Sequence, residues 1–392
     1  MARPSHDEMT HDTAGAPREN LPPPDQEMQA LLHFLSQQQA SDLHLKSGFA
    51  PIVRIGGHLR RIQGPPLPEN DYIEQMLMPM VPPGRGQELE RTGGVDFSVR
   101  IDTGDRFRIN LFRASGHTHA AIRRVQSKIP SFASLQLPDV YRQTIEHTYE
   151  GLIIVSGVTG SGKSSTLAAM LGWINEHRSM HVITIEDPIE FVFTPNKCII
   201  SQREVNLDVV DFPTALRHVV RQDPDCILIG EMRDRVTLLS AIQAAETGHL
   251  VLGTLHCSDA QQTFSRILEF FPREEHDFIR SSLASSLKAI MVQRLIPGIQ
   301  DGSRFPATEV LLNNSVTKDK ILHEEDEDIP AIISQCKEEG MRSFTQSLVD
   351  LVHADKIDRH TALEYAPNRD RLIAELKGIK AASGNLVGKL RG

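Results

Sequence analysis

Residues 152–164 read Leu152-Ile153-Ile154-Val155-Ser156-Gly157-Val158-Thr159-Gly160-Ser161-Gly162-Lys163-Ser164. The part from Gly157 onward matches the phosphate-binding motif G-x-x-x-x-G-K-[ST], and the apolar residues in front of it are typical of a buried strand. Glycines let backbone N–H groups face a phosphate, and the N-terminus of the following helix, expected over about residues 165–175, adds partial positive charge. A strand, this loop and a helix in that order predict a nucleotide-binding α/β domain.

The phosphate loop assigns roles to individual residues. Lys163 is expected to pair with the β and γ oxygens of ATP, and Ser164 is expected to ligate Mg²⁺. A chance glycine-rich turn is the alternative, and the match at every defined position of the motif argues against it. The residues expected to bind ATP are Gly157, Thr159, Gly160, Ser161, Gly162, Lys163, Ser164 and Ser165.

Short apolar runs recur beyond the loop, at residues 152–155, 181–185, 226–229 and 250–254, with helical stretches between them. Apolar strands that alternate with helices predict a parallel sheet covered on both faces. The preceding region differs, because its runs alternate polar and apolar residues and are separated by turns such as Gly56-Gly57. We therefore expect a smaller α+β domain with an antiparallel sheet before the α/β domain.

These patterns divide the chain into five parts. Residues 1–27 are expected to be a disordered tail, 28–127 the small α+β domain, 128–136 a linker, 137–339 the α/β domain and 340–392 a helical C-terminal segment. The acidic run Glu324-Glu325-Asp326-Glu327-Asp328 is expected to be a solvated loop, with a contact to a basic partner as the alternative.

Two carboxylates are candidates for the chemistry of hydrolysis, which needs a group that orients water and a group that holds the metal. Glu231 directly follows the strand 226–229, so we expect it to polarise water and to take part in binding Mg²⁺. Glu190 follows the strand 181–185 and is the second candidate. A purely structural role is the alternative for both. Asp234 is expected to cap the helix that follows it.

Histidines and arginines complete the candidate catalytic set. His249 and His256 flank the strand 250–255, and we expect them to sense the γ-phosphate, although lone histidines are usually ordinary core or surface residues. Arg113 and Arg123 lie in the small domain, where a guanidinium that reached a nucleotide would stabilise developing phosphoryl charge. A solvated basic strand is the alternative for both arginines.

Composition excludes several classes of protein. The 392 residues carry a net charge of −9 and only 5% aromatic residues, which argues against a nucleic-acid partner. No run approaches the ~18 apolar residues of a membrane span, and the N-terminus lacks the apolar region of a secretory signal. The four cysteines lie far apart, without zinc-binding spacing, as in a reduced cytosolic protein.

Four ordered blocks carry a resemblance to a known family. They are residues 157–170, Thr184-Ile185-Glu186-Asp187-Pro188-Ile189-Glu190-Phe191, residues 223–234 and residues 245–256. They closely resemble the Walker A, Asp box, Walker B and His box of the PilT-type secretion ATPases, which are the retraction motors of type IV pili. Residues 41–48 also look like the start of that family, so the resemblance spans about residues 28–365.

The resemblance implies a homohexameric ring with a PAS-like N-terminal domain and a RecA-like ATPase domain. It implies nucleotide binding by Lys163 and Ser164, a catalytic role for Glu231 and His-box roles for His249 and His256. Arg123 matches a family arginine, whereas the family's neighbouring arginine falls on Gly116, and Arg113 is its candidate substitute. The implied place is the cytoplasm, at the inner-membrane face, with a pilus platform protein as partner.

The subtype stays open on sequence grounds. The extension and type II secretion relatives carry a tetracysteine zinc motif that is absent here, so those roles are less favoured. The PilT motif Ala-Ile-Arg-Asn-Leu-Ile-Arg-Glu is replaced by Ser315-Val316-Thr317-Lys318-Asp319-Lys320-Ile321-Leu322, and nearby segments look more like PilU, the accessory paralogue. An accessory ring that assists a second retraction ATPase is thus one alternative, and a DNA-translocating ATPase is a weaker one.

Overall fold

The computed structural model describes residues 22–55, 58–69, 71–125, 128–300 and 302–379. The chain divides into two compact units, Met1–Ser127 and Lys128–Gly392, and each is described by itself. Of the expected disordered tail, residues 1–21 lie outside the described residues, as does the Gly56-Gly57 turn. The end of that tail was predicted wrongly, because helix α1 (Pro24–Gln37) already begins at Pro24. A proline is accommodated in the first turn of a helix, where its missing N–H is not needed.

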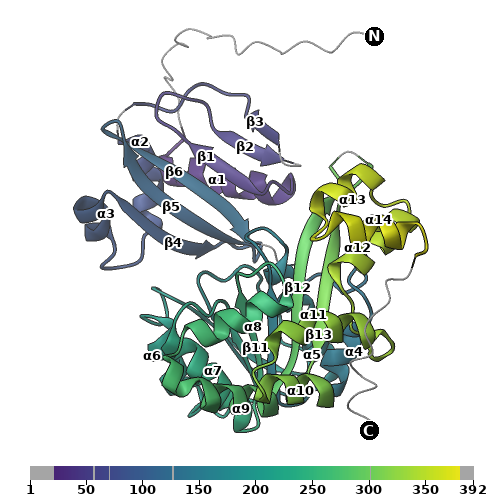
Figure 1. Ribbon diagram of the computed structural model, residues 1–392. Helices are drawn as coiled ribbons and strands as arrows, with labels where there is room; N and C mark the ends of the chain where they lie inside the picture. The colour runs from purple at the N-terminus through teal and green to yellow at the C-terminus, as the bar shows by residue number, and fades with distance from the viewer. Residues whose placement is uncertain (1–21, 56–57, 70, 126–127, 301, 380–392) are drawn as a thin grey trace, which may run out of the picture. The chain divides into compact units, whose positions relative to one another are not determined.

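The first unit is built on an antiparallel sheet with the strand order β3-β2-β1-β6-β5-β4, which confirms the predicted α+β class (Figure 1). Its strands are β1 (Asp42–Leu45), β2 (Ile52–Ile55), β3 (His58–Arg61), β4 (Gly94–Arg100), β5 (Arg106–Ala114) and β6 (His117–Val125). Its other helices are α2 (Tyr72–Leu77), the 3-10 turn η1 (Met78–Met80) and α3 (Gly86–Thr92). Strand β6 pairs with both β1 and β5 and thereby joins the strands β3-β2-β1 to the strands β5-β4 in one sheet.

The second unit has a mixed sheet with the order β13-β12-β7-β11-β10-β8-β9. Its strands are β7 (Gly151–Ser156), β8 (His181–Glu186), β9 (Ile199–Glu204), β10 (Cys226–Ile229), β11 (Leu250–Leu255), β12 (Leu287–Pro297) and β13 (Arg304–Leu312). The four predicted strands are β7, β8, β10 and β11, which form the parallel centre. Strand β12 continues the parallel pairing beside β7, and β13 pairs antiparallel with β12.

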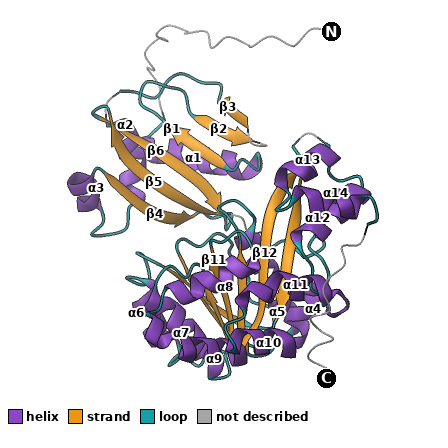
Figure 2. Ribbon diagram, in the orientation of Figure 1, coloured by secondary structure: helices purple, strands orange, loops and turns teal. Residues whose placement is uncertain are grey.

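Helices cover both faces of this sheet (Figure 2). The described helices and 3-10 turns of the second unit are α4 (Val140–His147), α5 (Lys163–His177), α6 (Phe212–Val219), α7 (Arg235–Glu246), α8 (Ala260–Glu269), η2 (Arg273–Glu275), α9 (His276–Ser286), α10 (Ser315–Leu322), η3 (Asp326–Asp328), α11 (Ile329–Gln335), η4 (Lys337–Glu339), α12 (Phe344–His353), α13 (Arg359–Tyr365) and α14 (Arg369–Leu376). The expected C-terminal helical segment contains α12, α13 and α14, and its residues 380–392 lie outside the described part.

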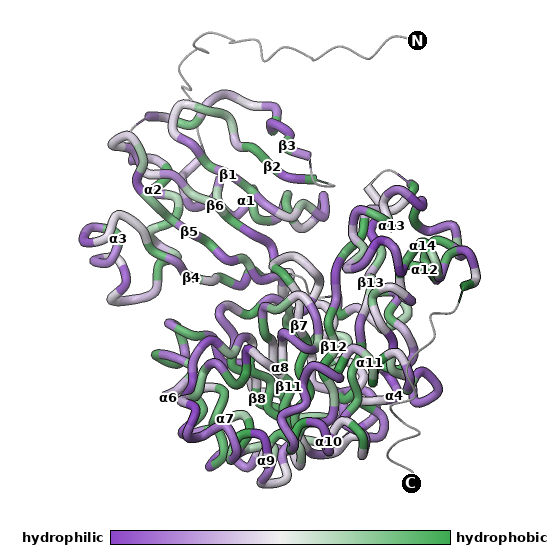
Figure 3. The backbone as a smooth tube through the Cα atoms, in the orientation of Figure 1, coloured by the Kyte–Doolittle hydropathy of each residue, from purple (hydrophilic) through white to green (hydrophobic). Residues whose placement is uncertain are grey.

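Two hydrophobic cores lie on the two faces of the sheet. Leu152 and Ile154 belong to one cluster, whereas Ile153 and Val155 belong to the other. Successive side chains of a strand point to opposite faces, so a strand that is buried on both sides feeds both cores. Figure 3 shows the same pattern as hydrophobic colour along the central strands and hydrophilic colour on much of the helical surface.

Three strands of the second unit, β9, β12 and β13, were missed in the sequence. Strand β12 begins at Leu287, directly after α9 ends at Ser286, so no turn residue marks the boundary. The carboxyl half of β9 holds Gln202, Arg203 and Glu204, which mask an edge strand. These strands are recognised only through their pairing with neighbours, which is information that a local pattern does not carry.

Residues 128–136, expected to be a linker, are attached to the second unit. Phe132 is a buried member of one core cluster, and Ile129 and Leu135 pack against it. A Cβ on Gly172 of helix α5 would lie 2.8 Å from Cγ2 of Ile129, so the absence of a side chain there makes room for this contact. The apolar residues of the segment therefore dock it on the second unit.

The acidic run 324–328 is exposed at Glu324, Glu325 and Glu327, as expected of a solvated loop, but several of its carboxylates also pair with basic residues of the same chain. Nη1 and Nη2 of Arg280 donate to the two carboxylate oxygens of Asp326 at 2.7 and 2.6 Å, and the side chain of Arg280 is only 8% exposed. Lys320 pairs with Glu325 and Asp328. These basic partners lie on α9 and α10 of the same chain, and the linear charge pattern does not reveal them.

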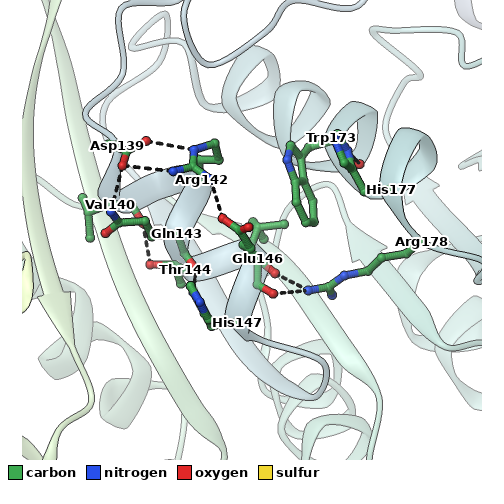
Figure 4. Close-up of polar contacts among 11 residues, drawn as sticks. Asp139, Val140, Arg142, Gln143, Thr144, Glu146, His147, Trp173, His177 and Arg178 are labelled. Carbon is green, nitrogen blue, oxygen red and sulfur yellow. Dashed lines mark hydrogen bonds and ion pairs between the residues drawn. The ribbon is translucent and has the colours of Figure 1, made fainter.

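Helix α5 ends in a cluster around its last turn, which Figure 4 shows in close-up. The guanidinium of Arg178 donates to the carbonyls of Ile145, Glu146 and Thr148 at the end of α4. The ring of Trp173 stacks on that of His177 with a centroid distance of 4.4 Å. Arg178 thus satisfies the free carbonyls of α4 and fixes α4 against α5.

Candidate active site

The carboxyl ends of β7, β8, β10 and β11 meet at one edge of the second sheet, where open α/β sheets bind ligands. The phosphate loop leaves β7 at this edge and enters α5 at Lys163. Nζ of Lys163 donates to the carbonyl oxygens of Gly157 and Val158 at 2.9 and 3.2 Å. The lysine side chain therefore lies against the backbone of its own loop, and its ammonium group is within the part of the loop that would surround a phosphate.

The loop backbone depends on its glycines. Gly157, Gly160 and Gly162 have φ angles of +147°, +78° and +92°, which residues with a side chain rarely adopt. A Cβ on Gly157 would also collide with the carbonyl oxygen of Gln293, whereas a Cβ on Gly160 would meet open space. The loop is thus tightly supported on its protein side and open at Gly160. Thr159 is exposed, Ser161 buried, and Ser164 and Ser165 half-buried.

Glu231 and His256 lie together beside the lysine. Nε2 of His256 is 3.2 Å from Oε1 of Glu231, and Nδ1 of the same ring is 3.5 Å from Nζ of Lys163. Burial acts to raise the pKa of Glu231, but the hydrogen bonds from Arg233 and His256 and the positive charge of Arg233 outweigh it, so the pKa lies below its usual value. Burial lowers the pKa of Lys163, against the opposing charges of Glu231 and Glu190.

Sequence reasoning missed two residues of this cluster. Arg233 donates from Nη2 to Oε2 of Glu231 at 2.6 Å and so holds the carboxylate ionised. Gln293, on β12, donates from Nε2 to the carbonyl of Ser161 at 2.8 Å and accepts from the Thr166 hydroxyl at 2.9 Å. The signal for Gln293 was present, since it directly follows the apolar run 289–292.

The carboxylates at the end of β8 and in the segment after it have different surroundings. Glu190 is exposed, and its charge acts on Lys163. Burial raises the pKa of Glu186 to about 7, although the Thr184 hydroxyl and the Gln202 amide donate to its Oε1 at 2.6 and 3.2 Å.

Asp234 lies after β10, just before α7. Its side chain accepts from the backbone N–H of Thr237 at 2.9 Å, which confirms its expected role as the cap of α7.

The expected placement of His249 beside the γ-phosphate is wrong. His249 precedes β11, and Leu250 pairs with Gly151 at the start of β7, whereas the phosphate loop follows the end of β7. Seven residue steps at ~3.3 Å each separate the two histidines by about 23 Å. Nδ1 of His249 instead donates to the carbonyl of Ala244 at the end of α7, at 2.9 Å.

The two arginine candidates belong to the first unit. Arg123, on β6, donates from Nε to Oδ1 of Asp42 at 2.8 Å, and 71% of its side chain is exposed. Arg113 lies on β5 and is exposed. Both remain candidates for reaching a nucleotide.

The residues around the loop fit Mg²⁺. Ser164 lies half-buried in the first turn of α5, next to Lys163, and Glu231 is the nearby carboxylate. Mg²⁺ typically retains several waters and takes further ligands from substrate phosphates, so one hydroxyl and one carboxylate are a sufficient protein contribution. Among the described residues, no group of three or more His, Cys, Asp or Glu side chains could hold a metal by itself.

None of the helices in the described part of the chain is both long enough and apolar enough to cross a bilayer.

Comparison with known proteins gives concordant results. The family described as "Type II/IV secretion system protein" matches residues 26–364. The chain is 39% identical to the type IV pilus retraction ATPase PilT of Pseudomonas aeruginosa over 336 residues, 86% of this chain and 97% of that protein. It is 35% identical to the type IV pilus ATPase PilU of the same organism over 351 residues, 90% of this chain and 91% of that protein.

A solved structure agrees with these relatives. The crystal structure of the pilus retraction motor PilT with bound ADP superposes with a TM-score of 0.81 at 38% identity. The match covers 87% of this chain and 97% of the solved one, so it includes both units.

Proposed function

The chain belongs to the type II/IV secretion system protein family, and from this membership we propose that it is a homohexameric motor that uses ATP hydrolysis to retract type IV pili. It is an ATP hydrolase of the group that contains the type IV pilus ATPases PilT and PilU. The retraction role is supported by the 39% identity that extends over 97% of the retraction ATPase.

The observation that carries the proposed chemistry is the contact of His256 with both Glu231 and Lys163. In the proposed reaction, Lys163 binds the β- and γ-phosphates and offsets the charge left on ADP when the terminal P–O bond breaks. Glu231, ionised at neutral pH, accepts a hydrogen bond from the attacking water and orients it. Water and ATP become ADP and phosphate.

Other residues have supporting roles in this proposal. The negative charge of Glu190 favours the protonated form of Lys163. Arg123 and Arg113 are candidate arginine fingers, which would stabilise the negative charge that develops on the phosphoryl group. Ser164, with Glu231 nearby, would hold Mg²⁺, which supplies positive charge to the phosphate oxygens when bound. His249 has no part in this chemistry, because it lies at the opposite edge of the sheet.

The proposed setting is the cytoplasmic face of the inner membrane, on a pilus platform protein, without nucleic acid. The net charge of −9 supports the absence of nucleic acid. The alternative is an accessory ring that binds nucleotide and assists a second retraction ATPase, as the PilU-like features imply. The altered segment over α10 and the 35% identity to PilU favour that alternative.

The experiment that tests the proposal is steady-state ATP hydrolysis by the purified chain with Mg²⁺, together with light scattering. Lys163→Ala is the control for a phosphate-loop origin of the activity. Turnover in a six-fold particle that is lost in the variant supports a self-sufficient motor. A particle that binds ATP but barely turns over contradicts it and favours the accessory role. Turnover that rises on adding DNA would contradict the absence of a nucleic-acid partner.

A further inference from the structure

Two adjacent residues of β12 hold different parts of the site from opposite faces of the sheet. Gln293 is 2% exposed and follows Val292, which pairs with Ser156 just before the phosphate loop. Its neighbours of the same parity, Ala289 and Met291, belong to the core cluster that contains α5. Arg294 has the opposite parity and faces the core shared by α8 and α12.

Gln293 uses its whole side chain on the phosphate loop. Its Nε2 donates to the carbonyl of Ser161 and its Oε1 accepts from Thr166, which lies one turn into α5. Its carbonyl oxygen occupies the space that a Cβ on Gly157 would need, and its Nε2 lies 3.1 Å from a Cβ built on Gly162. Gln293 therefore contacts the beginning, the middle and the end of the loop.

Arg294 joins two elements that are distant in sequence. Its Nη2 donates to the carbonyl of Ser258, two residues after His256, at 2.8 Å. Its Nη1 donates to the carbonyl of Tyr365 at the end of α13, at 3.4 Å, and its guanidinium lies 4.4 Å from the centroid of the Phe344 ring on α12. A planar guanidinium can make these three contacts together, whereas a lysine ammonium cannot.

We propose that Gln293 and Arg294 are positioning residues for ATP hydrolysis that couple the nucleotide site to the C-terminal helices. Gln293 holds the phosphate loop in its binding shape. Arg294 ties the segment after His256 to α12 and α13, so that the place of His256 and the packing of these helices change together. Figure 1 shows β12 and β13 extending toward α12 and α13 within the second unit.

The inference rests on the nucleotide site proposed above and not on the role in pilus retraction. Binding of the fluorescent analogue mant-ADP to the wild-type chain, with Lys163→Ala as control, tests that site first. If the wild-type chain shows no binding that depends on Lys163, the proposed site itself fails, before any variant of β12 is measured.

The first test concerns Gln293. Loss of its hydrogen bond to Ser161 in Gln293→Ala is expected to raise the Kd for mant-ADP about tenfold. Gln293→Glu retains the acceptor for Thr166 but loses the donor to Ser161 and adds negative charge beside the loop, so a loss at least as large is expected there. Arg304→Gln, an exposed change on the neighbouring strand β13, is the matched control. Wild-type affinity in both Gln293 variants would overturn this part.

The second test concerns Arg294. Arg294→Gln is expected to leave the Kd within about twofold of wild type while kcat falls about tenfold. Hydrogen exchange supplies a readout that a merely structural role would not move. Nucleotide is expected to slow exchange in α13 of the wild-type chain but not of the variant.

Three results would overturn the role of Arg294. The first is a wild-type kcat in Arg294→Gln. The second is an equal fold loss of nucleotide affinity and of kcat. The third is slowing of hydrogen exchange in α13 by nucleotide that persists in the variant. If Arg294→Gln does not fold, Arg294→Lys keeps the charge and is measured in the same way. A wild-type kcat in Arg294→Lys would then overturn the proposal.

Discussion

Nε2 of His256 lies 3.2 Å from Oε1 of Glu231, and Nδ1 of the same ring lies 3.5 Å from Nζ of Lys163. A lysine ammonium only donates, so Nδ1 must be the accepting nitrogen while that contact is present. The neutral ring then carries its proton on Nε2 and donates it to Glu231. The imidazole thus links the phosphate-binding charge to the proposed water-orienting carboxylate, and it does so in one tautomer.

Glu231→Gln should separate binding from hydrolysis. The amide has nearly the same shape but cannot remain a charged acceptor, so we expect phosphate release to fall at least a hundredfold while mant-ADP affinity stays within about threefold. Phosphate release and fluorescence titration on the same preparation would measure both. Retained turnover would remove Glu231 from the proposed mechanism. Asp234→Ala, which removes a helix cap, is the matched control and should lower Tm rather than kcat.

His256→Ala and His249→Ala should differ in kind. Removal of His256 breaks the contacts to Glu231 and Lys163, so kcat is expected to fall 10- to 100-fold. His249 lies at the opposite edge of the sheet and bonds Ala244 at the end of α7, so its loss is expected to lower Tm by a few degrees and to leave kcat of the folded protein nearly unchanged. Thermal unfolding and steady-state kinetics measure the two effects. Equal losses of kcat without a change in Tm would contradict this separation.

Stability should fall as the pH rises between 4.5 and about 7, because of Glu186. Burial raises its pKa in the folded chain to about 7 from a usual 4.5. In this window the folded carboxyl keeps a proton that the unfolded chain releases, so the unfolded state is favoured increasingly as the pH rises. Above pH 7 the stability that the protonated Glu186 carboxyl contributes is lost completely.

The matching variant is Glu186→Gln, which removes the charge and keeps the acceptor oxygen. Relative to wild type it should gain about 1–3 kcal/mol of unfolding free energy on going from pH 5 to pH 8. Urea unfolding at both pH values measures this difference, with the exposed Asp187→Asn as control. If the unfolding free energies of wild type and Glu186→Gln changed equally between pH 5 and pH 8, Glu186 would be ionised throughout this range and the prediction would be wrong.

Arg123 can be tested as a catalytic finger against its ion pair with Asp42. If Arg123 only pairs, Asp42→Asn and Arg123→Ala should both cost about 1–2 kcal/mol of stability and leave kcat unchanged. If it stabilises phosphoryl charge, as we propose, Arg123→Ala alone should lower kcat a hundredfold or more. Arg113→Ala, assayed in parallel, decides whether the second arginine shares this role.

The acidic run 324–328 should matter for stability. Arg280→Ala leaves Asp326 without its bidentate partner at a site where the two side chains are only 8% and 17% exposed. We expect a loss of about 3 kcal/mol in unfolding free energy. Arg266→Ala, which breaks an exposed pair with Glu269, is the control and should cost at most about 1 kcal/mol. Equal losses of unfolding free energy for the two variants in a urea titration would show that the pair of Arg280 with Asp326 stabilises the fold no more than an exposed ion pair does.

The parts of the fold that were predictable from sequence are those with a local signal. Buried strands such as β7 and β11 are uninterrupted apolar runs, and the phosphate loop has fixed residues at fixed spacing. Glu231 could be found because it directly follows one of these strands. Asp234 could be assigned as a cap because it stands just before a helical pattern.

What was missed depends on contacts between distant segments. Gln293 is 132 residues from the carbonyl that it holds, and Arg280 is 46 residues from Asp326. His249 was misplaced for a related reason. Its closeness to His256 in sequence is real, but a strand between them separates them by its full length. Side-chain partners of this kind appear only after the order of strands in the sheet is known.

The stack of Trp173 on His177 gives the chain an optical property. The sequence contains one tryptophan, and it lies on the same helix that begins with the phosphate-loop lysine. Excitation of indole fluorescence selectively at its red edge would therefore report from a single known point, without any added dye. Lys163 and Trp173 are ten residues apart on α5, about 15 Å along a continuous helix. Displacement of that helix when nucleotide binds would be recorded as a change in emission of the unmodified protein.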